Sequence, residues 1–438
     1  MQVTVENVNP VIRKISVEIP AERVDTEIEK TFGNIQKKAR LQGFRPGKAP
    51  LALIKRTYGD AMRDEVMRRF FEQTLYQALS EQKLEPVDSP LIDNELLEQG
   101  KPFRYSALVE IMPDVQLNDY SGFELKKETF VLDPAKIEGE IGRMRDNMAQ
   151  LVPLEENEAA ENGNVVTMDY TFTVAAFPGE NSTAEDATLE LGANRMAPGF
   201  EEQIIGMKCG EEKDISITLP ETYSNSEAAG AEAVFHVTIK EIKRKELPEL
   251  DDEFAQQFGD YETMEQLRAR MAEYLEKQET DRIESELKDR AVQALVSRNP
   301  LDVPPSMVKR QLEYMLENLK NRLKNQRMSI EMMGLDDDGF RERFRPAAED
   351  KVKGGLLLMA LVEKENITVA DDDLEARYTA IAAGNEEMLQ RVRDYYGTNA
   401  SARNTLSGEI KEDKAVRYLI DNAVVTEVAA EELNDQQQ

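Results

Sequence analysis

The sequence predicts a multidomain α+β protein: an N-terminal α+β domain, a β-sheet-plus-helix module, and an all-α C-terminal region. Three observations predict this. Apolar and polar residues alternate at both ends of the first 112 residues, with helical spacing between them. A second set of strand-like runs lies among Gly and Pro turns near the middle of the chain. From about residue 246 the apolar spacing is helical.

The N-terminal domain is expected to cover residues 1–112. Alternation predicts strands over 2–8, 11–19, 91–98 and 103–112. Helical spacing predicts helices from Pro20 to about Arg40, from Leu51 to Ile54, and from Ala61 to about Gln82. The two helical segments on either side of residues 41–50 are therefore bridged by that loop.

A connecting segment is expected over 113–150 and a compact module over 151–245. Within the module, residues 165–172, 215–219 and 233–239 read as strands, and a short helix is expected over 198–207 after a Pro-Gly turn. Residues 246–438 are expected to form a helical domain. Its helices are predicted up to about 297, from 307, and over 371–382, 385–397 and 400–421, with breaks at Asn299-Pro300 and 336–339.

The composition excludes several classes of function. The 438 residues include one histidine and one cysteine, so metal clusters of several His and Cys ligands and internal disulfides cannot be assembled. Phosphate-binding glycine motifs are absent from the sequence, and neither a signal peptide nor a membrane span is indicated. We expect no metal and no cofactor. His236 is expected to point outward from its strand, and Cys209 is assigned no role.

The loop Gly43-Phe44-Arg45-Pro46-Gly47-Lys48-Ala49-Pro50 displays an aromatic ring between cations. Residues 1–112 contain 17 Lys and Arg against 17 Asp and Glu, so the whole net charge of −30 lies in the rest of the chain. Residues 37–69 contain ten basic residues against three acidic ones. A solvated basic face is the simplest interpretation. The exposed ring favours a docking surface, where cations meet phosphate or carboxylate and Phe44 fills an apolar notch.

This loop resembles the signature of the trigger factor family, Gly-Phe-Arg, a variable residue, Gly, a variable pair and Pro. VPPSMVKRQLEYML, in the helical region, resembles the family's chaperone body with its two helical arms. The resemblance implies a cytoplasmic chaperone that binds nascent and unfolded polypeptides. It docks on ribosomal protein and rRNA near the tunnel exit, binds no DNA and no membrane, and can form a homodimer when free. The ribosome-binding residues it implies are Gly43, Phe44, Arg45, Pro46, Gly47 and Lys48.

The middle module resembles the FKBP-type peptidyl-prolyl isomerases. The resemblance rests on PGFEE, the following GM and GE, Pro-x-x-Tyr at 220–223, and AVFHV. It implies a proline-binding pocket formed by Tyr170, Met196, Ala197, Phe200, Tyr223 and Phe235, with Phe177 as a further candidate. A dry aromatic pocket disfavours the polar planar amide relative to the twisted transition state, so no acid, base or metal is required. From periodicity alone, the better interpretation of Tyr170, Phe200 and Phe235 is that they form the core of a small sheet domain.

Two alternatives to a ribosome-associated chaperone with isomerase activity remain open. The protein could be a free isomerase whose flanking domains select substrates, or a binding scaffold with a silent isomerase fold. Whether the protein suppresses aggregation of a proline-free client distinguishes a chaperone from a free isomerase. A proline-peptide isomerisation assay tests whether the isomerase fold is silent. Met328, Met332 and Met333 lie near helix breaks and could line an adaptable apolar surface, although methionine at helical spacing is more often core.

Overall fold

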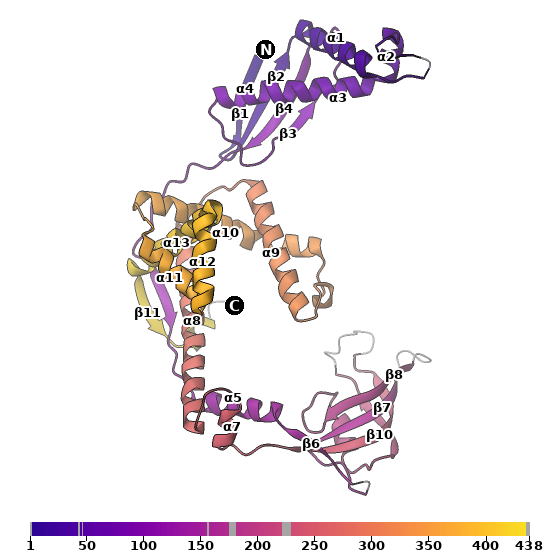
Figure 1. Cartoon of the computed structure of the whole chain (residues 1–438), viewed down its shortest axis with the longest axis vertical. Coiled ribbons are helices and arrows are strands. Elements are labelled where there is room, and N and C mark those ends of the chain that lie inside the picture. Colours follow the sequence, from indigo (N-terminus) through magenta and orange to yellow (C-terminus); the bar gives the residue numbers. More distant parts are fainter. Residues whose placement is uncertain are drawn as a thin grey trace. The chain divides into compact units, whose positions relative to one another are not determined.

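The computed structural model describes residues 2–42, 44–45, 47–155, 157–174, 181–220 and 229–434 (Figure 1). The chain divides into two compact units, one made of Met1–Thr129 with Ile283–Gln438 and the other of Phe130–Arg282. In the described ranges, no helix is long and apolar enough to cross a membrane. In the same ranges, no group of three or more His, Cys, Asp or Glu side chains could hold a metal ion.

The N-terminal sheet has the strand order β1-β2-β4-β3, and all its pairs are antiparallel. Its strands are β1 (Gln2–Asn9), β2 (Ile12–Ile19), β3 (Leu91–Asn94) and β4 (Phe103–Glu110). Successive side chains of a strand point to opposite faces, so Ile15, Val17 and Ile19 of β2 enter the core together. The predicted strands are confirmed, although β3 is shorter than expected.

The helices of this domain pack on one face of the sheet (Figure 1). They are α1 (Ala21–Lys38), α2 (Leu51–Thr57), α3 (Gly59–Phe70), the π-helical turn η1 (Phe71–Leu75) and α4 (Tyr76–Glu81). The helix predicted from Ala61 to Gln82 is thus interrupted by a π turn. There, buried Thr74 shares a 2.6 Å hydrogen bond with the Tyr105 hydroxyl, and its hydroxyl also donates to the Phe70 carbonyl.

The second unit contains a five-stranded antiparallel sheet in which β10 pairs with β6, β7 and β9, and β8 pairs with β7. Its elements are α5 (Pro134–Asn147), β6 (Gln150–Pro153), β7 (Asn164–Val174), β8 (Asn181–Glu190), α6 (Phe200–Ile204), β9 (Glu212–Thr218), β10 (Glu232–Glu246) and α7 (Asp252–Gln256). Three strands and the short helix were predicted. The sequence analysis missed β6 and β8.

The remaining residues are mostly helical, as predicted. The helices are α8 (Met264–Arg298), α9 (Pro305–Asn325), the 3-10 turn η2 (Glu331–Met333), α10 (Asp337–Lys364), α11 (Asp371–Ala382), α12 (Glu386–Thr398), α13 (Ala400–Asp421) and α14 (Ala430–Asn434). The break expected at 336–339 is a helix start, because Asp336 caps α10 by accepting a hydrogen bond from Gly339 N. The first unit also contains a parallel pair that the sequence analysis missed, β5 (Glu124–Glu128) with β11 (Val424–Val428).

The residues that follow the N-terminal sheet are part of the core of the helical body. Leu117, Phe123 and Leu125 are buried among apolar side chains of α8, α10 and α13. Asn299, itself buried, accepts hydrogen bonds from the backbone N of Asn118 and Asp119 through Oδ1. Its Nδ2 donates to the Asp119 and Leu295 carbonyls. Part of the expected connecting segment is therefore held firmly, while the domain limits at 112, 150 and 245 stay predictions.

Ile15→Ala is expected to lower the free energy of unfolding of the N-terminal domain by about 2–5 kcal/mol, because it opens a cavity at a fully buried position. Urea unfolding followed by the NMR methyl signal of Met62, which lies in the same core, measures this. Ser16→Ala, one residue along and exposed, is the control and should change stability by less than about 0.5 kcal/mol. Equal effects of the two substitutions would contradict the assigned strand orientation.

Candidate functional site

The candidate isomerase site is built on two neighbouring strands. Tyr170 and Phe172 are two residues apart on β7, so both side chains lie on the same face of the sheet. Phe235 on β10 is paired directly with Phe172. Phe200, the first residue of α6, reaches the same face and is fully buried. Four rings from three elements therefore converge over the sheet.

The rings contact one another closely. Phe235 is central: its ring centroid is 5.1 Å from that of Phe172 in a stacked arrangement and 4.9 Å from that of Phe200 in an edge contact. Tyr170 lies 5.8 Å from Phe235 and 6.4 Å from Phe172. Offset and edge contacts of this kind stabilise aromatic clusters beyond their burial. Tyr170 and Phe172 are only partly buried, so part of the cluster's surface is exposed.

Met196 and Ala197 complete the described part of the cluster, and Glu201 fixes the loop that carries them. Both residues pack against the aromatic core and precede α6. The Glu201 carboxylate, only 6% exposed, accepts four backbone hydrogen bonds from residues 192–196. The donors are Gly192 N at 2.8 Å, Asn194 N at 3.0 Å, Arg195 N at 2.7 Å and Met196 N at 3.2 Å. A single buried charge thereby gives the loop one conformation.

The electrostatics of Glu201 follow from these contacts. Burial alone would raise its pKa, but the four backbone N–H donors outweigh burial and hold the pKa below its usual value. Gly192 supports the arrangement because its φ is +90° and a Cβ there would lie 1.9 Å from Asn162 Oδ1. Gly199, at φ +85°, provides the left-handed residue from which α6 starts.

The structure brings together five of the residues predicted for the pocket: Tyr170, Met196, Ala197, Phe200 and Phe235. Tyr223 and Phe177 lie outside the described residues. The sequence analysis missed Phe172 and Glu201. Phe172 could have been identified, because it is two residues from Tyr170 in the same predicted strand and so faces the same side. In contrast, no sequence pattern distinguishes the buried Glu201 from its exposed neighbour Glu202. The cluster offers an apolar surface with one phenol, which suits recognition of a proline ring and offers no nucleophile.

The histidine and the cysteine lie outside this cluster. His236 is exposed on β10, and its Nδ1 is 2.7 Å from Asp214 Oδ1. That hydrogen bond raises the pKa of the imidazole. Cys209 is exposed, and its thiol donates to the Lys240 carbonyl. The outward orientation predicted for His236 is confirmed.

The second candidate site is the loop between α1 and α2. Its described residues are pinned by Gln36, whose carbonyl accepts from Gly47 N at 3.1 Å and whose Nε2 donates to the Ala49 carbonyl at 2.7 Å. Phe44 N donates to the Leu41 carbonyl. Gly47 has φ +82°, the left-handed conformation that glycine tolerates. Gly43 and Pro46 lie outside the described residues.

The side chains of this loop are available to a partner. Phe44 is 41% exposed, and Arg45 and Lys48 are exposed as well. Of the ten basic residues in 37–69, only Arg63 and Arg69 make ion pairs within the described part of the chain. The other eight leave the region around the loop with uncompensated positive charge: Lys37, Lys38, Arg40, Arg45, Lys48, Lys55, Arg56 and Arg68.

Glu201→Gln is expected to lower the free energy of unfolding of the module by about 1–3 kcal/mol at neutral pH, because a neutral amide cannot accept four backbone hydrogen bonds. The folded pKa of Glu201 lies below the usual 4.5, so its contribution is fully present above that pH and is lost as pH falls through the folded pKa. The substitution should therefore flatten the acid limb of the stability profile.

Urea unfolding at several pH values, followed by the methyl signal of buried Met168, measures both effects. Glu202→Gln is the matched control, since Glu202 is exposed and next in sequence. If the two variants share one pH profile, the loop-fixing role of Glu201 is wrong.

Comparison with known proteins identifies the family to which the chain belongs. Residues 1–144 match a family model described as bacterial trigger factor protein, residues 263–421 match bacterial trigger factor protein C-terminus, and residues 156–240 match FKBP-type peptidyl-prolyl cis-trans isomerase. The trigger factor of Pelobacter propionicus is 61% identical over 427 residues, 98% of each chain. Those of Trichlorobacter lovleyi and Geobacter metallireducens are 59% and 48% identical over at least 99% of each chain. The chain therefore belongs to the trigger factor family, ribosome-associated chaperones that carry an FKBP-type peptidyl-prolyl isomerase domain.

Proposed function

We propose that this chain docks on the ribosome through the tip of the loop between α1 and α2. The proposed contact residues are Gly43, Phe44, Arg45, Pro46, Gly47 and Lys48. The observation that carries this is an exposed aromatic ring on a pinned loop, surrounded by cations that make no ion pair in the described chain. A surface of rRNA and ribosomal protein near the tunnel exit offers phosphates for the cations and apolar notches for the ring.

Docked there, the protein would meet nascent chains, shield their apolar segments and isomerise X–Pro bonds in a cytoplasmic setting. The proposed proline site consists of Tyr170, Met196, Ala197, Phe200, Tyr223 and Phe235, to which we add Phe172. Uncatalysed isomerisation crosses a barrier of ~18–20 kcal/mol. Binding the less polar twisted amide in an aromatic site lowers that barrier, and each ~1.4 kcal/mol is worth tenfold in rate. Free protein is proposed to exchange between monomer and homodimer.

Replacing Phe44, Arg45 and Lys48 together by alanine should weaken association with ribosomes by at least about tenfold, since an interface anchor and two phosphate contacts are lost. Co-sedimentation with purified ribosomes at several salt concentrations measures this. The slope of the logarithm of affinity against the logarithm of salt should become shallower in the variant, because fewer counterions are released.

The matched control removes one exposed ring and two cations elsewhere in the same domain, at Tyr76, Lys83 and Lys101. It should co-sediment as the wild type does. Undiminished co-sedimentation of the loop variant would refute the docking assignment.

Phe235→Leu should lower kcat/KM for an X–Pro peptide by at least about tenfold, because it removes the ring that the other three contact while nearly keeping volume. A protease-coupled peptide assay measures the rate. Val234→Ala, on the opposite face of β10 and partly exposed, is the control.

Suppression of aggregation of a proline-free client should be intact in both variants if the chaperone does not depend on the isomerase. If Phe235→Leu lost both the isomerisation and the suppression of aggregation, a free isomerase would be favoured. No rate above background in the wild type would favour a scaffold with a silent isomerase fold.

A further inference from the structure

β7 and β8 are neighbouring strands of the isomerase sheet (Figure 1), and their pairing is irregular beside Tyr170. Met168 pairs with Ala187, and Tyr170 pairs with Ala184. Two residues of β8 therefore oppose the single residue Asp169 of β7, which makes this a β-bulge. One extra residue moves the side chains beyond it to the other face, so the bulge decides which residues of β8 lie next to the rings.

The bulge keeps a charged side chain away from the rings. Directly paired residues of an antiparallel pair lie on the same face, so the small residue Ala184 lies beside Tyr170. In a regular ladder continued from Ala187, the partner of Tyr170 would be Glu185 instead. Its carboxylate would hold water on the apolar face that is proposed to bind proline, and would weaken the preference for the less polar twisted amide.

A second irregularity lies on the other side of β7. Ile239 and Glu241 of β10 pair with consecutive residues of β7, so Lys240 between them is an extra residue. Its backbone carbonyl accepts a hydrogen bond from the Cys209 thiol at 2.8 Å. Ile239 is buried and Lys240 is exposed, so the Lys240 side chain lies on the outer face of the sheet. Both irregularities therefore border the short stretch of β7 that contains Asp169.

Three charged side chains join the strands at this place. Lys240 Nζ lies 2.8 Å from Asp169 Oδ1 and 2.6 Å from Asp186 Oδ1. Asp169 Oδ1 also accepts a hydrogen bond from Asp186 N at 2.8 Å. Asp186 is a bulge residue with φ +52°, a left-handed conformation that Asp tolerates better than most residues. The network thus ties β7, β8 and β10 together where the regular ladder is interrupted.

The network lies on the face of the sheet that is turned away from the rings. Alternate side chains of a strand point to opposite faces, so Asp169 points away from the rings while the next residue, Tyr170, points toward them. Hydrogen bonding between the two groups lowers the pKa of Asp169 and raises that of Lys240, so both stay charged at neutral pH. These side chains can influence the reaction only through the position of the strands.

We propose that Asp169, Asp186 and Lys240 are positioning residues of the isomerase, because they hold the bulge that places Ala184 rather than Glu185 beside Tyr170. The proposal rests on the proline site proposed above and adds three residues that act without contacting the peptide. The alternative is a solvated ion-pair network that has a small effect on stability alone, as exposed ion pairs often do.

The first test is Asp169→Ala in the full-length protein, which removes the acceptor shared by Lys240 and the Asp186 backbone. We expect kcat/KM for an X–Pro peptide to fall by about tenfold in the protease-coupled assay. We also expect loss of the nuclear Overhauser effect between the Ala184 methyl and the Tyr170 ring, since directly paired side chains are close enough to give one.

Glu190→Ala is the matched control. It removes a 2.9 Å ion pair between the same two strands, from Glu190 of β8 to Lys245 of β10, at a place where the pairing of β8 is regular. It should keep both the rate and the Overhauser effect. An equal loss of rate in the control and in Asp169→Ala would overturn the proposal in favour of general destabilisation of the sheet.

The double substitution Asp169→Ala with Glu185→Ala tests the cause of the loss. If the single substitution acts by moving the Glu185 carboxylate onto the site face, removing that carboxylate should restore most of the lost kcat/KM. Glu185→Ala alone should be neutral, because Glu185 is exposed in the wild type. A purely structural role gives no reason for such a rescue, so its absence would overturn the proposal.

Asp186 provides a second test that leaves Asp169 in place and decides the matter if Asp169→Ala does not fold. Asp186→Gly should keep the rate, because glycine adopts positive φ freely and its N–H can still donate to Asp169. Asp186→Val should lower the rate, since a β-branched residue strongly disfavours φ +52°. Equal rates for the two substitutions would show that the bulge conformation does not matter and would overturn the proposal.

The outcomes separate this proposal from the proposed function. If the wild type isomerises the peptide and Asp169→Ala does so equally well, with only a lower urea midpoint, the positioning role is wrong and the proline site stands. If the wild type shows no rate above background, the proposed function of the site is itself wrong.

Discussion

Burial of Leu117, Phe123 and Leu125 in the core of the helical body is the constraint on which the rest of the structure depends. Phe123 is fully buried, and the Arg298 guanidinium lies 4.8 Å from its ring centroid. Asn299 holds the backbone of the same segment with hydrogen bonds from both ends of its amide. Because the segment precedes Phe130 and its partners follow Ile283, the isomerase unit is an insertion into the body. The body can form only when both sides of the insertion come together.

The two candidate sites share one physical device, a polar side chain that fixes a loop through backbone hydrogen bonds. Glu201 does this for residues 192–196, and Gln36 does it for the loop that carries Phe44. In the loop, Phe44, Arg45 and Lys48 are exposed and Gln36 is partly buried. In the isomerase site, Tyr170, Phe172 and Met196 keep some exposed surface, whereas Glu201 is buried. A loop that is already ordered loses little conformational entropy on binding, so more of the contact energy appears as affinity.

Much of the fold could be predicted because its signals are local. Alternation located β2 and β4, and helical spacing located α1 and α11. The pair β5 and β11 could not be found this way, since ELKKE is short and charged and its partner lies at the other end of the chain. The π turn at 71–75 contains Thr74, whose hydroxyl contacts Tyr105 of β4, outside the helix itself. Contacts between residues far apart in the sequence produce no periodic pattern by which they could be predicted.

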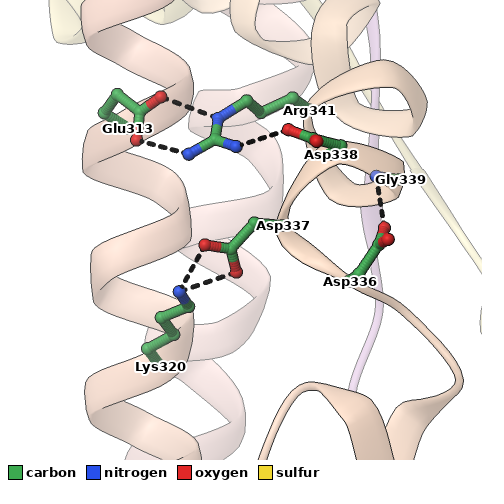
Figure 2. Close-up of polar contacts among 7 residues, drawn as sticks. All are labelled: Glu313, Lys320, Asp336, Asp337, Asp338, Gly339 and Arg341. Atoms are coloured by element: carbon green, nitrogen blue, oxygen red, sulfur yellow. Dashed lines mark hydrogen bonds and ion pairs between the residues drawn. The ribbon is translucent and has the colours of Figure 1, made fainter.

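The same holds for the sites. The motif resemblance identified five of the described residues of the predicted proline site. Phe172 could have been identified as well, because it lies two residues from Tyr170 on the same strand and therefore on the same face. Glu201 became recognisable only when four N–H groups were seen to converge on its carboxylate. The pairing of Arg341 with Glu313 (Figure 2) likewise could not be predicted, because composition alone does not tell which of many charges have a partner.

The insertion has a consequence for the order in which this protein becomes functional during its own synthesis. The N-terminal sheet is complete once β4 has left the ribosome, whereas the core around Phe123 requires Leu419 of α13. At ~5–20 residues per second the two events are separated by roughly 15–60 s. A new molecule thus possesses the N-terminal domain, with the loop proposed to dock on the ribosome, well before the helical body can form. During that interval the apolar side chains of Leu117, Phe123 and Leu125 are exposed, and the newborn chaperone is itself a potential client of the finished ones.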